Sequence, residues 1–92
     1  MDLGELRQKI DEIDDGLISL FLRRMDVSAE IALYKHKHGI PVYDPVREQQ
    51  KLHDLSHKVK KGHEAHVSAL FSLLFEISRS EQERVLSSEE PI

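Results

Sequence analysis

Several charged and polar side chains stand at positions where helical periodicity calls for apolar ones. Arg24 interrupts an otherwise apolar heptad seam, and Lys35, eleven residues later, returns to within about 20° of the same helix face. Glu48 begins the apolar row of a second helical segment, and Ser78 and Gln82 continue the apolar row of a third. Because a buried charge is costly unless it is paired or hydrogen-bonded, this set predicts a functional pocket.

The charges of this set indicate which ligand the pocket binds. Arg24, Lys35 and Arg47 outnumber the carboxylate of Glu48, which follows Arg47 directly. Arginine binds carboxylates through two parallel hydrogen bonds, so we expect a small ligand with two carboxylates. Each residue alone also has an ordinary explanation. An arginine can extend its head to water, a glutamate near a helix start favours the helix dipole, and Ser or Gln can mark the edge of a buried face.

The groups needed for covalent or metal-assisted chemistry are missing from these positions. The chain has no cysteine, and it contains no plausible triad and no glycine-rich phosphate loop. Among six histidines, His53 and His57 have a spacing that a metal could use, but no HExxH pattern surrounds them. We interpret them as exposed helix residues and expect no metal. The set therefore predicts a reaction catalysed by positioning and electrostatic stabilisation.

A long amphipathic helix, expected from about residue 2 to residue 38, must position Arg24 and Lys35. Asp2 can cap its start, and Gly39 followed by Pro41 ends it. At 1.5 Å per residue this helix is about 54 Å long, whereas a compact domain of this size is about 30 Å across. The seam is exposed unless a second chain covers it, so we predict an interlocked homodimer. The apolar seam residues are Leu3, Leu6, Ile10, Ile13, Leu17, Leu20, Val27, Ile31 and Tyr34.

Arg7 extends this argument to the second chain. It lies seventeen residues before Arg24, which places it about 25 Å away along the helix axis and about 100° around it. The two arginines therefore cannot reach one pocket from the same helix. In the interlocked dimer, the partner subunit's Arg7 can reach the pocket that contains Arg24.

Two shorter helices are expected to supply the other polar residues. Asp44 and Pro45 predict a helix start, and this second helix is expected to end near residue 60. The third is expected from about residue 64 to residue 85, with an apolar row of Val67, Leu70, Phe71, Leu74 and Val85. Gly16, inside the first helix, is attributed to close helix packing. We expect one all-α domain over residues 1–92, with residues 86–92 as a frayed tail.

The composition is typical of a small helical protein. Of 92 residues, 39% are hydrophobic and 33% charged, and only three prolines and four glycines interrupt the chain. The net charge of −4 disfavours a nucleic-acid partner. No apolar run has the length of a secretory leader or of a membrane span, so we expect a cytoplasmic protein that does not bind membranes.

Several motifs together carry a resemblance to a known family. Residues 6–14 read L-R-x-x-I-D-x-I-D, and residues 44–48 read D-x-x-R-E. The single residues that match are Arg23, Arg24, Lys35, Ser78 and Gln82. From Leu3 to Val85 the chain resembles the chorismate mutases of the all-helical class. The resemblance implies a monofunctional enzyme that rearranges chorismate to prephenate without a cofactor, in phenylalanine and tyrosine biosynthesis.

The resemblance also implies an intertwined homodimer of three-helix chains with two composite sites. In each site, the partner subunit's Arg7 and Arg24 would bind the two carboxylates of chorismate. Lys35 and Gln82 would donate hydrogen bonds to the ether oxygen, where negative charge develops as the C–O bond breaks.

The remaining residues complete the site that the resemblance implies. Glu48, helped by the backbone at Asp44, would accept a hydrogen bond from the ring hydroxyl of chorismate. Arg47 and Ser78 would complete the polar lining, with Ser78 near a carboxylate.

Two alternatives stay open at this point. The first is isochorismate pyruvate lyase, which shares this fold and much of the cationic lining, and which residues 23–26 also resemble. Glu48 and Ser78 favour the mutase over the lyase. The second is a helical dimerisation module that keeps the scaffold without the chemistry.

Overall fold

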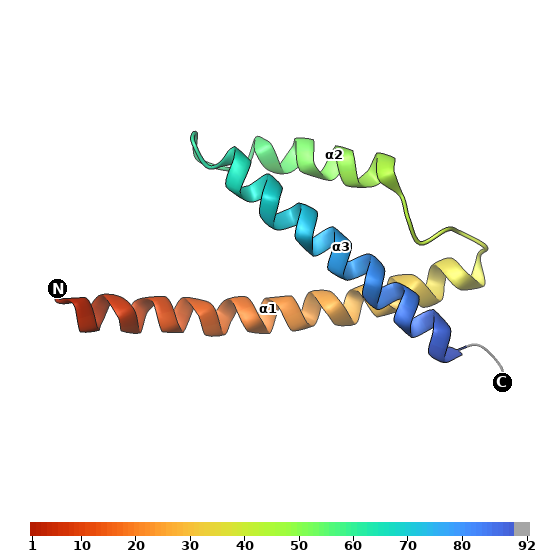
Figure 1. Ribbon diagram of the computed structural model, residues 1–92, viewed down its shortest axis with the longest axis horizontal. Coiled ribbons are helices and arrows are strands. Elements are labelled where there is room, and N and C mark those ends of the chain that lie inside the picture. Colours follow the sequence, from red (N-terminus) through yellow and green to blue (C-terminus); the bar gives the residue numbers. More distant parts are fainter. Residues whose placement is uncertain (90–92) are drawn as a thin grey trace.

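The protein consists of three helices joined by two loops, with no strand among the described residues. The computed structural model describes residues 1–89. Its helices are α1 (Leu3–Lys37), α2 (Pro45–Ser56) and α3 (Glu64–Glu89), shown in Figure 1. The predicted all-α fold with one long N-terminal helix and two shorter ones is confirmed.

The first two helices begin at the capping residues that the sequence predicts. The Asp2 carboxylate accepts a hydrogen bond from the Glu5 backbone N–H at 2.8 Å. The Asp44 carboxylate accepts one from the Arg47 N–H at 3.0 Å, and Pro45 occupies the first helical position. Each cap satisfies one of the N–H groups that a helix start leaves without a partner.

The end of α1 is a complete Schellman turn. Gly39 has a φ of 66°, and its N–H donates to the His36 carbonyl at 3.3 Å. The Ile40 N–H reaches back to the Lys35 carbonyl at 2.8 Å. A left-handed residue is required for this pair of bonds, and glycine adopts that conformation without steric cost. The turn fixes the direction in which the chain leaves α1 beside Lys35.

The helix α2 ends at Ser56, four residues before the predicted end at residue 60. The Lys58 N–H donates to the Leu55 carbonyl at 3.0 Å, a bond to the third preceding residue that tightens the last turn. The Ser56 hydroxyl also donates to the His53 carbonyl at 2.6 Å. Such a side-chain bond competes for a carbonyl group that the next helical turn would use, which explains why the helix stops before Lys58.

The helix α3 runs four residues beyond the predicted end at residue 85. Residues 86–89, which were expected to belong to a frayed tail, are thus part of α3, and the last part of that tail, residues 90–92, lies outside the described residues. No glycine or proline interrupts positions 86–89. The Ser87 hydroxyl donates to the Glu83 carbonyl at 2.9 Å, so this serine bonds back along the helix instead of breaking it.

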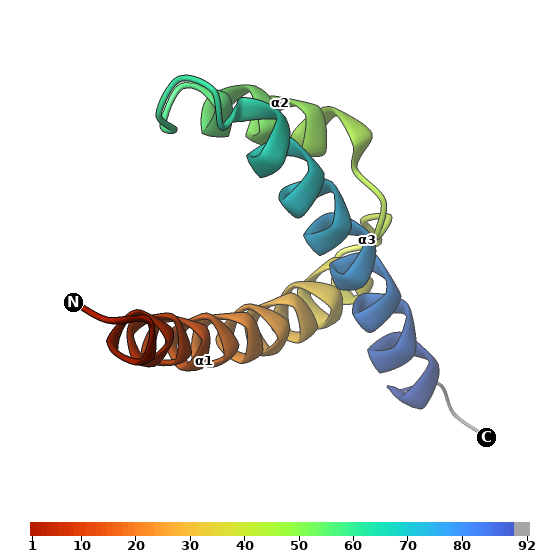
Figure 2. The ribbon, with the colours of Figure 1, turned by 60° about the vertical axis from the view of Figure 1, so that its left-hand side comes forward.

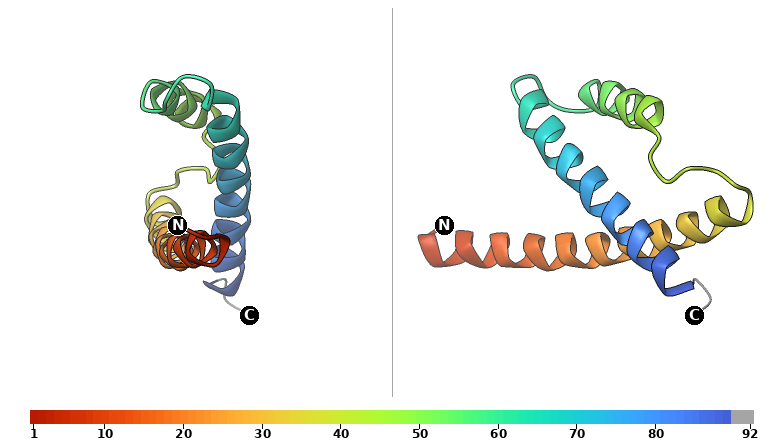
Figure 3. Two further views of the ribbon diagram at one scale, coloured as in Figure 1. Left: turned by 90° about the vertical axis from the view of Figure 1, so that its left-hand side faces the viewer. Right: turned by 45° about the vertical axis from the view of Figure 1, so that its right-hand side comes forward.

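The helices form an open arrangement in which α3 connects the other two. It packs across the C-terminal half of α1 and along α2. In Figures 2 and 3, α1 and α2 lie on the same side of α3, one near each end of it. The N-terminal half of α1 projects away from both. The described chain measures 57 × 29 × 14 Å. Its radius of gyration is 16.8 Å, against about 12 Å for a compact domain of this length.

Much of the apolar surface of this chain is exposed. Its accessible surface is 7547 Å², whereas a folded monomer of this mass exposes about 5,500 Å². Among the described residues, only Ala32 and Phe75 are buried hydrophobic side chains. Leu70, expected in the inward row of α3, is 53% exposed. The seam residues of α1 that stay exposed are Leu3, Leu6, Ile10, Ile13, Leu17, Leu20, Val27, Ile31 and Tyr34.

Gly16 does not contact another part of its own chain. A Cβ placed on it meets no atom within 4 Å. The close packing that the sequence suggested for Gly16 is therefore not present within one chain. No described helix is long and apolar enough to cross a membrane.

Candidate active site

The predicted polar residues come together around one cavity of about 470 Å³. It lies between the C-terminal half of α1, the loop before α2, the start of α2 and the second half of α3. Of the eight residues singled out in the sequence, all except Arg7 line it. Its lining consists of Arg24, Ser28, Ile31, Lys35, Val42, Asp44, Arg47, Glu48, Lys51, Phe75, Ser78, Arg79 and Gln82.

Arg24 is a half-buried cation held by neutral groups. Its Nη1 donates to the Ser78 hydroxyl and, at 3.5 Å, to the Leu74 carbonyl. Its guanidinium carbon lies 6.0 Å from the centre of the Phe75 ring. Burial lowers the pKa of Arg24, because no carboxylate offsets the loss of water around the charge. Within residues 1–89 Arg24 forms no ion pair, so it is available to an anionic ligand.

Lys35 is positioned by the loop that follows its own helix. Its Nζ donates to the Val42 carbonyl at 3.0 Å. The turn at Gly39 brings this carbonyl back over the last turn of α1. One neutral oxygen therefore holds the ammonium group at the cavity wall, and the other Nζ protons are free to bond a ligand.

The α3 side of the cavity carries two buried polar side chains. Ser78 and Gln82 are each only 7% exposed. The Gln82 Oε1 atom is buried and has no hydrogen-bond partner among the described residues. A buried polar atom without a partner is uncommon and indicates a group that another molecule satisfies.

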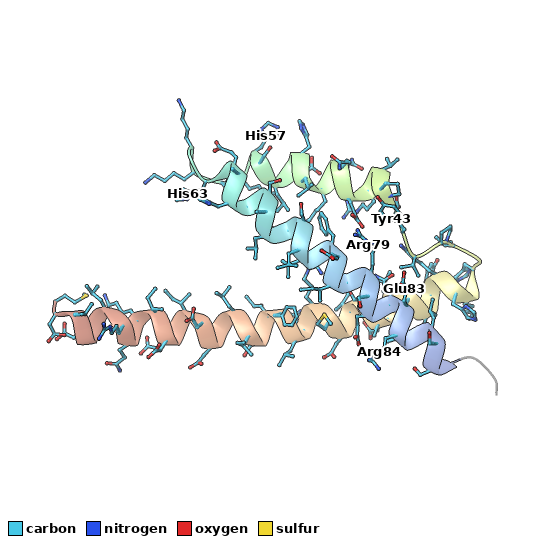
Figure 4. All side chains as sticks on the ribbon, in the orientation of Figure 1. Tyr43, His57, His63, Arg79, Glu83 and Arg84 are labelled. Atoms are coloured by element: carbon cyan, nitrogen blue, oxygen red, sulfur yellow. The ribbon has the colours of Figure 1, made fainter. Side chains whose placement is uncertain are left out.

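Glu48 is paired with an arginine that the sequence analysis missed. The Nη1 of Arg79 donates to both carboxylate oxygens of Glu48 at 2.5 Å. The Arg79 guanidinium also lies over the Tyr43 ring, 4.9 Å from its centre. Hydrogen bonding to Glu48 raises the pKa of Arg79. Figure 4 shows Arg79 on α3 facing Tyr43, just before α2 begins.

Asp44 and Arg47 lie at the rim of the cavity. The Asp44 carboxylate caps α2, so this side chain is already engaged. The Asp44 carbonyl accepts the Glu48 N–H at 3.1 Å. Arg47 is exposed, and it extends the cationic lining toward the opening.

The cavity is cationic overall. Five lysines and arginines line it against two carboxylates. One of these carboxylates is neutralised by Arg79. Electrostatic attraction therefore favours a ligand with more than one negative charge.

Arg7 is the one predicted residue that the chain does not bring to the cavity. It lies in the projecting half of α1, where it lines a separate hollow. That hollow is lined by Leu3, Leu6, Arg7, Ile10 and Asp11. Its place in the site of a second chain stays a prediction.

Three cavity residues that were not predicted have spacings in the sequence that place them on the same helix faces as predicted ones. Ser28 is 5% exposed and lies four residues after Arg24 and seven before Lys35, on the same helix face. Arg79 lies four residues after Phe75 and three before Gln82, again on one face. Lys51 follows Glu48 by three residues in the same way. These spacings identify the face, but not the contacts that each residue makes.

The histidines lie apart from this cavity. The Nε2 atoms of His53 in α2 and of His57, the residue that follows α2, are 3.3 Å apart, and both residues are exposed. Among residues 1–89 no group of three or more histidines, cysteines and carboxylates is placed to hold a metal ion. The imidazole pair is thus a surface feature at the C-terminal end of α2.

A family model described as chorismate mutase type II matches residues 6–83. The chain belongs to this family. The matched segment includes every residue that lines the cavity and also Arg7. The resemblance inferred from the motifs is confirmed.

Relatives of known structure and name support the assignment over most of the chain. A chorismate mutase from Methanocaldococcus jannaschii is 33% identical over 87 residues, covering 91% of this chain and 87% of that protein. The crystal structure of chorismate mutase from Helicobacter pylori in complex with prephenate superposes with a TM-score of 0.84 at 35% identity. That match covers 92% of this chain and 93% of the other.

A third relative is much longer than this chain. The T-protein of Haemophilus influenzae is 44% identical over 46 residues, which is 50% of this chain. The aligned region spans 12% of the T-protein. This chain thus corresponds to a small part of that protein.

Proposed function

We propose that this protein catalyses the rearrangement of chorismate to prephenate, a step toward phenylalanine and tyrosine. The observation that carries the proposal is the cavity itself. It places a half-buried Arg24 without a carboxylate partner beside Lys35 and a buried Gln82 with an unsatisfied oxygen. A small dicarboxylate pairs with the cations of such a site, and chorismate is one, with a ring hydroxyl that can donate a hydrogen bond.

The first task of these residues is to hold the substrate in a reactive shape. Arg24 binds one carboxylate of chorismate, and Ser78, which already accepts a hydrogen bond from Arg24, orients the guanidinium. A second cation binds the other carboxylate. With both ends fixed, the enolpyruvyl arm lies over the ring, where the new carbon–carbon bond forms.

The second task is to stabilise charge as the ether bond breaks. The Lys35 ammonium and the Gln82 amide donate hydrogen bonds to the ether oxygen, whose negative charge grows in the transition state. Glu48 accepts a hydrogen bond from the ring hydroxyl. No covalent intermediate and no proton transfer to the protein is needed, which agrees with the residue types in the cavity.

The second cation is the partner subunit's Arg7 in a homodimer. Supporting this, the chain exposes about 2,000 Å² more than a compact monomer of its mass, and the apolar seam residues of α1 are exposed. Obligate dimers bury surfaces of this size. In that dimer each site combines the cavity of one chain with the N-terminal half of α1 from the other.

Replacing Leu17 by aspartate is expected to break the dimer. Leu17 is 58% exposed in the single chain, but it lies in the middle of the seam that we propose to be covered. Burying an unpaired carboxylate costs several kcal/mol, so the variant should be monomeric and inactive. Sedimentation equilibrium measures the mass. Ser19→Asp, on the outer face of the same helix, is the matched control and should remain dimeric; a dimeric Leu17→Asp protein contradicts the proposed interface.

Prephenate is expected to raise the melting temperature. At a concentration 100-fold above Kd, a ligand stabilises the folded state by about 2.7 kcal/mol, which raises Tm by on the order of 10 °C in a domain of this size. Arg24→Met should lose most of the shift, whereas Arg23→Met, an exposed neighbour outside the cavity, should keep it. A wild-type Tm that prephenate leaves unchanged is the result expected of a non-catalytic dimerisation module.

The same protein should not release salicylate from isochorismate. This assay separates the mutase from the lyase that the sequence left open. Accumulation of salicylate at a rate comparable with chorismate loss would reassign the cavity to the lyase reaction.

A further inference from the structure

The Glu48–Arg79 ion pair is part of the cavity wall, and its position suggests a role in substrate choice. Both oxygens of Glu48 bond to one guanidinium nitrogen of Arg79. The side chains are 23% and 31% exposed, so the pair is partly shielded from water. It joins α2 to α3 at the place where Glu48 faces the cavity.

Two features hold Arg79 in this position. Its guanidinium is stacked on Tyr43, and an arginine over an aromatic ring gains further electrostatic stabilisation. Its own helix carries Phe75 and Gln82 on the same face, so its stem is fixed beside the cavity. Figure 4 shows Tyr43, in the loop before α2, near Arg79 on α3.

The pair changes what Glu48 can recognise. Each carboxylate oxygen still has a lone pair after bonding Arg79, so Glu48 can accept a hydrogen bond from a neutral hydroxyl. Its negative charge, however, is already balanced. A ligand ammonium at the same place would meet the Arg79 guanidinium at close range and would gain little net attraction.

We propose that Arg79 is a positioning and specificity-determining residue, which neutralises Glu48 so that the site selects a ring hydroxyl over a ring ammonium. This inference rests on the proposed function, because it assigns Glu48 to the ring substituent of chorismate. A bare Glu48 carboxylate would attract the ammonium of a chorismate analogue in which an amino group replaces that hydroxyl. Arg79 removes this attraction and leaves the hydrogen-bond acceptor in place.

The test compares chorismate turnover with the inhibition constant of the amino analogue as a competitor. Arg79→Met removes the charge at similar volume, and Arg79→Gln removes it while keeping an amide donor for Glu48. In both variants kcat/KM for chorismate should fall about tenfold, while the analogue should bind about tenfold more tightly. Arg79→Lys restores the charge and should return both values to within about threefold of wild type.

The control is Arg84→Met, which removes an arginine from the exposed ion pair with Glu81, outside the cavity. Arg84→Met should leave both kcat/KM for chorismate and the inhibition constant of the analogue unchanged. If the only role of Arg79 is to hold α2 against α3, its loss lowers kcat/KM for chorismate and also weakens binding of the analogue. This result overturns the proposal. So does an analogue affinity that stays constant in Arg79→Gln. If instead the wild-type protein does not convert chorismate, the proposed function itself is wrong. The wild-type assay shows this before any variant is compared, so the two failures are distinguishable.

Discussion

Replacing Lys35 by alanine is expected to lower kcat about 100- to 1,000-fold while KM changes much less. The ammonium is proposed to donate to the ether oxygen, and that bond strengthens only as negative charge develops in the transition state. Removing one such donor typically costs this factor in kcat. Steady-state kinetics with chorismate measure both constants, and the split between them separates stabilisation of the transition state from substrate binding.

The control for Lys35 is its neighbour Lys37. It lies at the exposed end of the same helix and does not line the cavity, so Lys37→Ala should keep wild-type kcat. Lys35 also bonds the Val42 carbonyl, so the melting temperature of Lys35→Ala must be measured beside its activity. A stable Lys35→Ala protein with retained turnover would remove Lys35 from its proposed role.

Mixing two inactive variants is expected to restore activity. Arg7→Ala and Lys35→Ala each damage both sites of their own homodimer. In a mixed dimer, however, one site receives Lys35 from one chain and Arg7 from the other, and is intact. With equal amounts and free exchange of subunits, half of the dimers are mixed and each has one working site, so the mixture should reach about a quarter of wild-type activity.

This complementation depends on sites shared between chains. A useful control mixes Arg24→Ala with Lys35→Ala, because both residues lie in the cavity of the same chain. In that mixed dimer each site has one damaged cavity, so no activity should return. Absence of recovery in the Arg7 and Lys35 mixture, after subunit exchange has been verified by mass, contradicts the composite site.

The sequence was sufficient to predict features that depend only on helical periodicity or on neighbouring residues. Arg24 and Lys35 are eleven residues apart, so any α-helix places them on nearly the same face, and both line the cavity. The caps at Asp2 and Asp44 and the terminator at Gly39 were predicted because their chemistry is local. In such cases neighbouring residues determine the structure.

Features that depend on contacts between helices could not be predicted in the same way. Arg79 pairs with Glu48 across 31 positions of sequence, and that pairing depends on how α3 packs against α2. The early end of α2 is a local feature, in which the Ser56 hydroxyl bonds the His53 carbonyl, but residues 57–60 contain no glycine or proline that would mark it in the sequence. Leu70 follows the helical repeat but is exposed, because no element of its own chain covers that side of α3.

The open shape of the chain also explains why Arg7 could be placed only by inference. Its separation from Arg24 follows from helix geometry alone. In the proposed homodimer, a second chain covers the exposed seam between them and brings the two arginines together. One chain therefore supplies the cavity, and in the proposed dimer the partner subunit's Arg7 supplies the second carboxylate-binding cation.

The most direct test of the proposed function is the loss of chorismate, followed by absorbance, with the purified protein and no added cofactor. We predict a steady decrease that is proportional to protein concentration, with prephenate as the sole product by NMR. The decrease should be abolished in Arg24→Ala and unaffected in Arg23→Ala. If folded, dimeric protein leaves the rate of chorismate loss at its uncatalysed value, that result would contradict the proposed function.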